Sequence, residues 1–225
     1  MCGRYLNRTP ASETARIFGT TNAVPTYPPR FNLSPTETVL TVRFNPDDGR
    51  RHLEPMRWGL IPVSAKDRSA GNKMFNAPCE SIAETPAFRD AFAKKRCLIP
   101  ADGFYEWKKA ASGKEPYAIL PAEGEACFAF AGLWERWRDP STQETVRSCT
   151  IITCPSNTVM EPIHDRMPVI LDRASWPLWL GEQNGKRQDI LKLLKPSPPA
   201  GMRAFRIGQR VNNVRNDDAA LILPE

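Results

Sequence analysis

The chain of 225 residues has little that would place it in or across a membrane. No stretch of 18 consecutive apolar residues occurs, so the sequence predicts no membrane-spanning helix and no membrane partner. The N-terminus lacks the apolar segment of a signal peptide, which predicts a cytoplasmic protein. With 41% hydrophobic residues and no internal repeat or low-complexity segment, the chain is long enough to bury a core of its own.

Patterns for metal binding and disulfides are scarce as well. Six cysteines occur without a CxxC pair, and the chain has two histidines. Because zinc sites and disulfide frameworks need more closely spaced ligands, we expect reduced thiols, no metal and no cofactor. The net charge of +6 and the pI near 9.1 permit an anionic partner, but they are too mild to identify one.

The 22 prolines divide the chain into many short elements. A helix is predicted from Thr9-Pro10 to Gly19, with Thr9 as N-cap, and a second one begins at Thr85-Pro86. Further helical stretches are 173–180 and 186–195, and strands are predicted at 37–44, 97–100, 103–108, 116–120, 126–133, 148–154 and 167–171. Strands dominate the middle of the chain, so we expect a single α+β domain over 1–225, with a curved, barrel-like mixed sheet and flanking helices.

The most distinctive residue is Cys2, directly behind the initiator methionine. Methionine aminopeptidases remove Met1 when the next side chain is small, and the chain would then begin with a 1,2-aminothiol. Its amine, with a pKa of roughly 7.7–8.0, and its thiol, at about 8.5, both supply a nucleophile near neutral pH. Such a pair condenses with an aldehyde to a five-membered thiazolidine. Taken alone, the dipeptide favours an ordinary small residue at position 2.

Two polar clusters carry further candidates. On a strand through 103–108, Glu106 shares a face with Phe104 and Lys108, and the aromatic surroundings would raise its pKa toward general acid–base duty. An exposed Glu106 paired with Lys108 is the alternative. His164 lies among charges at the entrance to an apolar strand, where Asp165 could orient its ring, although an ordinary surface histidine fits as well. His52 has the pattern of an exposed strand residue.

Seven short motifs are distributed along the chain. They are MCGRY at 1–5, RFNLSP at 30–35, WGLIP at 58–62, FNAPCE at 75–80, ADGFYEWK at 101–108, PIHDRMP at 162–168 and VNNVRN at 211–216. Together these segments resemble the SOS response-associated peptidase (SRAP), or abasic-site processing, family. The resemblance runs from residue 1 to about 223, and each motif occurs in the family's order.

The resemblance implies a defined reaction and fold. Members of the family form a covalent crosslink with abasic sites in single-stranded DNA, through the N-terminal cysteine and the ring-opened sugar, and so shield the lesion in the DNA damage response. The positions that match the family's active site are Cys2, Asn76, Glu106 and His164. We therefore expect a monomer that binds single-stranded DNA with abasic sites and is nucleoid-associated when bound. The implied fold, a mixed α/β domain around a barrel-like sheet, agrees with the pattern of elements.

We assign each of these four residues a hypothetical role in the reaction. The Cys2 amine attacks the aldehyde and its sulfur traps the imine. Glu106 moves the amine proton, His164 protonates the sugar ring oxygen, and Asn76 orients the Cys2 amine or a sugar oxygen.

Contacts with the DNA backbone are expected from three further residues. Arg4 follows Cys2 by two positions, so on an extended strand it shares the same face and could reach a flanking phosphate. Asn32 and Arg166 are the other candidates for backbone contact.

The chain departs from the family at two expected DNA contacts. Pro78 stands where the family usually carries an arginine, and Val63 and Ser64 follow the WGLIP segment where a tryptophan is common. We expect the chemistry to survive with altered DNA affinity, and the salt dependence to flatten by roughly one counterion.

Other functions use the same residues. An N-terminal-cysteine (auto)peptidase would employ Cys2 with Glu106 or His164 as base, and a lyase would cleave the DNA strand at the lesion. A non-covalent single-stranded DNA-binding module predicts binding that is indifferent to Cys2. A structural domain with an incidental Cys2 is the remaining alternative.

Overall fold

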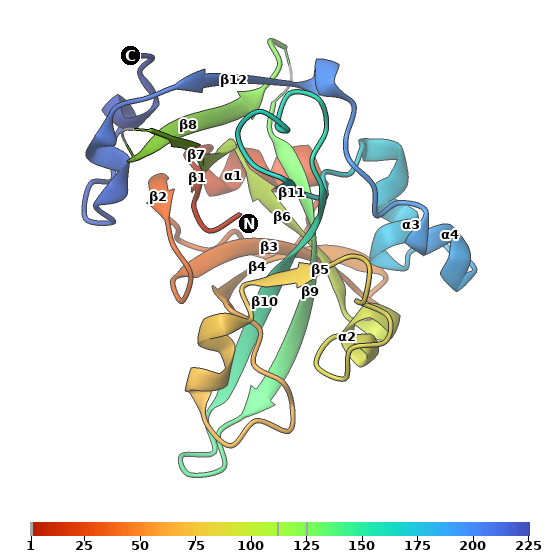
Figure 1. The fold of residues 1–225 in the computed structure, drawn as a ribbon. Coiled ribbons are helices and arrows are strands. Elements are labelled where there is room, and N and C mark those ends of the chain that lie inside the picture. The colour runs from red at the N-terminus through yellow and green to blue at the C-terminus, as the bar shows by residue number, and fades with distance from the viewer. Residues whose placement is uncertain (1, 112, 125) are drawn as a thin grey trace.

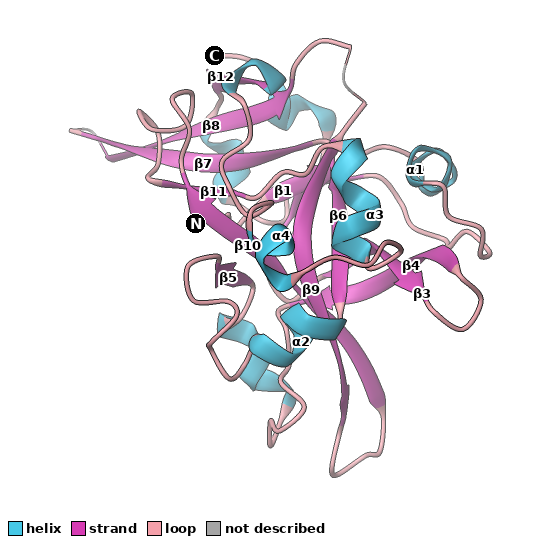
Figure 2. Cartoon of the chain, turned by 90° about the vertical axis from the view of Figure 1, so that its right-hand side faces the viewer, coloured by secondary structure: helices cyan, strands magenta, loops and turns pink. Residues whose placement is uncertain are grey.

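The computed structural model describes residues 2–111, 113–124 and 126–225. It has two sheets with short helices at their edges (Figures 1 and 2). Among the described helices, none has the length and apolar character needed to cross a membrane.

The first sheet closes on itself as a five-stranded barrel, in the order β10-β4-β3-β6-β9 and back to β10. All pairs in this ring are antiparallel except β10 with β4. The strands are β3 (Thr38–Asn45), β4 (Arg50–Trp58), β6 (Arg96–Ala101), β9 (Phe128–Arg138) and β10 (Thr145–Pro155). Closure leaves no free edge within the ring, and β10 is long enough to pair with two more strands beyond it. These are β5 (Asn76–Pro78) and β11 (Arg166–Pro168).

The second sheet has the order β12-β8-β7-β1-β2 and lies across one end of the barrel (Figure 1). Its strands are β1 (Tyr5–Asn7), β2 (Arg30–Leu33), β7 (Gly103–Ala110), β8 (Gly113–Pro121) and β12 (Met202–Arg206). The red N-terminal segment in Figure 1 therefore enters the molecule between the two sheets, at its centre.

Short helices flank these sheets. The α-helices are α1 (Ala11–Phe18), α2 (Arg89–Lys94), α3 (Trp176–Leu180) and α4 (Arg187–Leu191). Short 3-10 helices occupy Arg68–Lys73, Arg173–Ser175, Pro199–Gly201, Gln209–Asn212 and Ala219–Ile222. The predicted α+β domain with a barrel-like mixed sheet is confirmed.

Two helix starts were predicted wrongly. Helix α1 has Pro10 at its N-cap, because the Thr9 hydroxyl donates to the carboxylate of Asp102, at 2.5 Å, instead of capping the helix. Its end at Gly19 is confirmed, with a left-handed φ of 66° that suits glycine. Helix α2 begins at Arg89, since the residues after Thr85 form turns.

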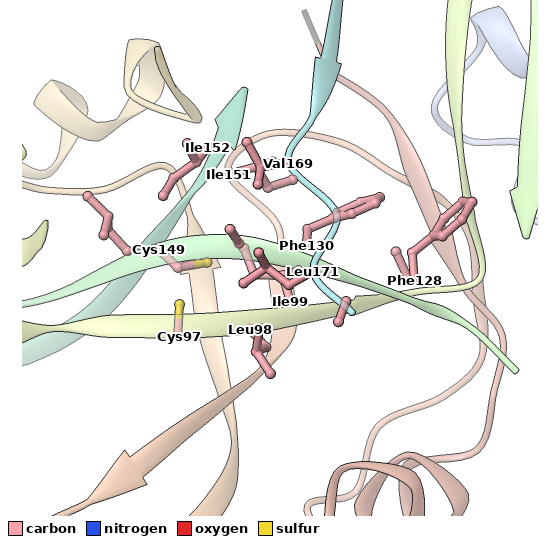
Figure 3. Packing of buried hydrophobic residues seen from close by; sticks show 14 of the residues in the cluster. Cys97, Leu98, Ile99, Phe128, Phe130, Cys149, Ile151, Ile152, Val169 and Leu171 are labelled. Carbon is pink, nitrogen blue, oxygen red and sulfur yellow. The ribbon is translucent and has the colours of Figure 1, made fainter. Parts of the chain in front are cut away.

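Buried aromatic side chains tie the N-terminal strand to the barrel. The Tyr5 ring lies 5.1 Å from that of Trp58 and 6.0 Å from that of Phe130, edge-on in both cases. Such pairs add about 0.5–1.5 kcal/mol each beyond the burial of their area. Figure 3 shows Phe130 among the aliphatic side chains of the barrel strands, with the thiols of Cys97 and Cys149 buried in the same core. Because Tyr5 is anchored in this core, the residues just before it have a fixed place.

Candidate active site

Four different elements bring the predicted site residues together. Cys2 precedes β1, Asn76 begins β5, Glu106 lies in β7, and His164 lies in the turn before β11. The Asn76 Nδ2 donates to the Cys2 carbonyl oxygen at 2.7 Å, and Nε2 of His164 lies 4.0 Å from Oε2 of Glu106. The Glu106 carboxylate is close enough to Cys2 to raise the pKa of its thiol. These four residues thus form one compact group, although Cys2 and His164 lie more than 160 positions apart in the sequence.

Cys2 has no solvent-exposed surface. Burial raises the pKa of its thiol, the Glu106 carboxylate raises it further, and a hydrogen bond from the Arg4 backbone N–H acts in the opposite sense. The resting form is therefore the neutral thiol, which needs a neighbouring base to become a nucleophile. Met1, whose removal the sequence analysis expects, lies outside the described residues.

Glu106 is buried within this group, and 4% of its side chain is exposed. Its pKa is raised to about 7, chiefly by burial; the backbone N–H of Trp107 acts in the opposite direction, and the nearby Asp165 carboxylate adds a smaller upward effect. A carboxyl group that titrates near neutral pH can both accept and return a proton, as general acid–base catalysis requires.

The His164 ring is oriented by the backbone of its own turn. The Arg166 N–H donates to Nδ1 at 3.0 Å, so the neutral ring carries its proton on Nε2, the atom that faces Glu106. Burial lowers the pKa of His164, which favours this neutral form. The exposed Asp165 carboxylate also lies 2.9 Å from Nδ1 and stabilises the ring when it is protonated.

Asn76 joins the site to the barrel. Strand β5 pairs in parallel with β10, with Asn76 opposite Ile151, and this pairing aims the amide at Cys2. The amide Oδ1 is buried and has no hydrogen-bond partner in the part of the chain that the structure describes. A buried acceptor without a partner is costly, so this oxygen is ready to accept a donor beside Cys2.

A family model described as SOS response associated peptidase (SRAP) matches residues 1–214. The chain belongs to the SRAP family. It is 38% identical over 224 residues to the abasic site processing protein YoqW of Bacillus subtilis and 39% identical over 226 residues to YoaM of the same organism. The alignments cover 99% of this chain in both cases, with 99% of YoqW and 97% of YoaM. A crystal structure of a protein from Bacteroides thetaiotaomicron superposes with a TM-score of 0.89 at 26% identity, covering both chains completely.

In this SRAP protein, Arg4 and Asn32 form one unit. The Arg4 Nη1 donates to the Asn32 Oδ1 at 2.8 Å and to the Val211 carbonyl at 3.0 Å, and its guanidinium lies 5.8 Å from the centre of the Trp107 ring. Asn32 is fully buried, and its Nδ2 donates to the carbonyls of Val211, Asn213 and Asn216. Asn32 was expected to contact DNA directly, but its amide is buried and instead holds Arg4 and the C-terminal loop.

Arg166 is also engaged within the protein. Its guanidinium makes two hydrogen bonds to the Glu80 carboxylate, at 2.5 and 3.0 Å, and a third to the Thr153 carbonyl at 2.8 Å. The pairing with Glu80 raises the pKa of Arg166, and 21% of its side chain is exposed. A phosphate could reach it only beside or in place of Glu80.

One residue with a large structural effect was missed from the sequence. Asp102 is buried, and its carboxylate accepts the N–H groups of Arg8 and Thr9 at 2.6 and 2.8 Å, which fixes the chain that leads out of β1. The pair Asp102-Gly103 in the sequence could have indicated this structural role. Gly103 has a φ of +157°, and a Cβ there would lie 2.7 Å from the Ile119 carbonyl oxygen, so no other residue fits beside Asp102.

The two departures from the family pattern lie on the surface. Pro78 is exposed at the end of β5, two residues after Asn76, and Val63 is 64% exposed. Neither side chain has a hydrogen-bond donor for a phosphate. Among the described residues, no group of three or more His, Cys, Asp or Glu side chains could hold a metal ion.

Proposed function

We propose that this protein, once Met1 is removed, forms a covalent thiazolidine crosslink between Cys2 and abasic sites in single-stranded DNA, and so shields the lesion. The observation that carries the proposal is the juxtaposition of Cys2 with a carboxyl group of pKa about 7 and with the Nε2 of His164. Relatives of the same length, such as YoqW, are named abasic site processing proteins.

The atoms and protons of the proposed crosslinking reaction balance without a cofactor. In its protonated form, which Asp165 stabilises, His164 gives its Nε2 proton to the ring oxygen of the closed deoxyribose, while the C1′ hydroxyl loses its proton to water and the sugar opens to the C1′ aldehyde. The freed Cys2 amine adds to C1′, and loss of the resulting hydroxyl as water leaves an imine. The Cys2 sulfur then bonds to C1′ and its proton passes to the nitrogen, which closes the five-membered ring.

Glu106 serves as the proton carrier of these steps. Its carboxylate takes a proton from the attacking amine, and the same group in its acid form returns it to the departing hydroxyl. A pKa of about 7 leaves both forms populated at neutral pH. The amine attacks first, because burial keeps the Cys2 thiol protonated until the imine has formed.

Asn76 and Arg4 supply orientation. The open Oδ1 of Asn76 suits an N–H of the freed Cys2 amine, while its Nδ2 already holds the Cys2 carbonyl. Arg4, placed by Asn32 beside Trp107, offers a cation and an aromatic surface for the DNA that flanks the lesion. Arg166 contributes a further phosphate contact when it exchanges Glu80 for DNA.

A second candidate activity is self-removal of Met1. The family's description as a peptidase favours it, and so does the placement of Glu106 beside Cys2. In this reaction the Cys2 thiol, deprotonated by Glu106, would attack the carbonyl of Met1, and the Met1–Cys2 peptide bond would break as its nitrogen takes the proton back from Glu106. Water would then hydrolyse the resulting thioester, which releases methionine and restores the thiol. Mass spectrometry of the Glu106→Gln protein, made in cells that lack methionine aminopeptidase activity, separates the two routes. Met1 retained in this variant but lost from the wild type supports self-removal, and Met1 retained in both proteins argues against it.

The crosslink has a direct test. The processed protein is incubated with a single-stranded oligonucleotide that carries one abasic site and is then run on a denaturing gel. We expect a shifted band that survives heat and detergent in the wild type and in Cys127→Ala, a matched cysteine control. The band should be missing with Cys2→Ala and with intact DNA. A stable band in Cys2→Ala, or none in the wild type, would sink the proposal.

A further inference from the structure

A cavity lies apart from the candidate active site. It has a volume of about 710 Å³ and is lined by residues from the start of β9, from helix α3 and from the segment that leads from α4 to β12. Small-molecule sites in proteins span about 300–1,000 Å³. Its apolar lining includes Ile17, Phe128, Leu171, Trp176 and Leu193, and none of the four candidate active-site residues lines it.

The two aromatic side chains that line this cavity, Phe128 and Trp176, pack against other aromatic rings of the protein. The Phe128 ring packs against those of Phe104 and Phe130, at 6.2 and 6.1 Å between centres, and Figure 3 shows Phe128 and Phe130 along the same strand. The Trp176 indole is stacked on Phe18 at 4.6 Å, with 10° between the ring planes. Both walls are therefore in place before any ligand arrives, which lowers the entropic cost of binding.

The charges around the cavity are mostly positive. Arg173, Lys192 and Lys195 line it against one carboxylate, that of Asp172. Asp172 is already engaged, because its Oδ1 accepts hydrogen bonds from both the backbone N–H and the hydroxyl of Ser175, at 2.8 Å each. Lys192 is paired with Asp189 at 2.9 Å, and the Arg173 guanidinium lies 5.9 Å from the centre of the Trp176 ring. The described lining therefore favours an anion close to Arg173 and Lys195.

One buried hydroxyl group in the lining of the cavity lacks a hydrogen-bond partner among the described residues. The Oγ of Ser197 is buried and has no hydrogen-bond partner within the described ranges, while the backbone carbonyl of the same residue accepts from Asn157 at 2.9 Å. Buried hydroxyls normally have a partner, so a polar group of a ligand would complete this one.

We propose that this cavity binds a small flat aromatic anion, such as an aromatic carboxylate, sulfonate or phosphate ester. The aromatic body packs against Phe128 and Trp176, the acidic group lies toward Lys195 and Arg173, and Ser197 donates its hydroxyl hydrogen. This site is separate from the crosslinking reaction and does not depend on it.

The probe for the test is 8-anilinonaphthalene-1-sulfonate, an aromatic sulfonate of suitable size. We expect saturable binding of one molecule per folded chain by fluorescence titration, together with a higher melting temperature in its presence. An unrelated oligonucleotide without a lesion serves as competitor, because the same cations could attract DNA.

Gly201 offers a sharp blocking variant. It lines the cavity, and a Cβ built on it meets no heavy atom within 4 Å, so Gly201→Trp places an indole in the space without backbone strain. Gly208→Trp is the matched control, since Gly208 is equally open but lies outside the cavity. Lys195→Glu tests the charge, and Lys66→Glu makes the same change at an exposed position elsewhere.

Binding should be lost in Gly201→Trp and weakened at least about fivefold in Lys195→Glu, as expected for removal of one partly screened charge contact, with both controls like the wild type. Circular dichroism and the crosslinking rate confirm that the variants are folded. Equal binding in the wild type and both cavity variants would overturn the proposal. Displacement of the probe by the intact oligonucleotide would overturn it too, because the cavity would then belong to the DNA surface.

Discussion

Nε2 of His164 and Oε2 of Glu106 face each other at 4.0 Å, and burial reverses the usual order of their two pKa values. The pKa of Glu106 rises to about 7, while that of His164 falls below its usual value. Near neutral pH the pair can therefore exist as a neutral acid beside a neutral imidazole, so that it holds one proton in place of a fixed ion pair. This arrangement suits a reaction in which protons are taken and returned several times.

Replacing Glu106 by Gln should slow crosslinking by about 100-fold, the lower range for the loss of a general acid–base group. Single-turnover gels measure the rate, and fluorescence anisotropy with intact single-stranded DNA should give an unchanged Kd. The wild-type rate should rise as the pH passes through about 7, when the base form of Glu106 becomes populated, and this step should vanish in the variant. The assignment fails if both proteins share one pH profile.

The same carboxyl group should make stability depend on pH. Its pKa is about 7 in the folded protein and 4.5 in a freely solvated side chain, so the folded state holds the extra proton between these values. Stability therefore falls as the pH rises from about 4.5 to about 7, by up to about 3 kcal/mol. Urea unfolding at pH 5 and pH 8 measures this change, and Glu106→Gln should lose most of it. A variant whose pH dependence matches the wild type would contradict the buried carboxyl group.

Asn32→Ala should lower the free energy of unfolding by about 2 kcal/mol, because it leaves buried carbonyls without donors. Affinity for single-stranded DNA should also fall, since Arg4 loses the acceptor that places it beside Trp107. Asn184→Ala, at an exposed position, is the matched control. Denaturant melts and DNA titrations check the two effects, and a stable variant with full affinity would show that Asn32 does not position Arg4.

Exchange of Glu80 for DNA at Arg166 predicts opposite effects for two substitutions. Glu80→Gln should tighten binding of single-stranded DNA because it frees the guanidinium, whereas Arg166→Ala should weaken it and reduce the salt slope by roughly one. Titrations over a range of salt concentrations give both values. If Glu80→Gln leaves the affinity unchanged, Arg166 has a purely structural role.

Pro78→Arg introduces the arginine that the resemblance to the family implies at this position, which is the exposed end of β5. The added cation, close to Asn76, should tighten DNA binding and steepen its salt dependence by roughly one counterion. Binding isotherms at several salt concentrations, compared with Pro78→Gln as a neutral control, measure the change. An equal gain in both variants would trace the effect to loss of proline and not to charge.

Local elements were predictable where a short stretch of sequence decides them. The alternation at 103–108 placed Phe104 and Tyr105 on opposite faces, and in the structure they lie in separate hydrophobic clusters. Gly19 ends a helix because few other residues adopt its backbone angle easily. The start of α1 was misjudged because Thr9 bonds to Asp102, a partner 93 positions away that no local pattern reveals.

Residue order alone was enough to indicate the chemistry of the site, since Cys2, Asn76, Glu106 and His164 carry their reactive groups wherever they lie and their motifs follow the family's order. Tertiary packing decided how those groups behave. The pKa of Glu106 reaches about 7 because sheet and barrel exclude water from it, and Asn32 is buried because the C-terminal loop closes over it. Solvent exclusion and long-range hydrogen bonds depend on elements distant in sequence, so they became visible only once the chain was folded.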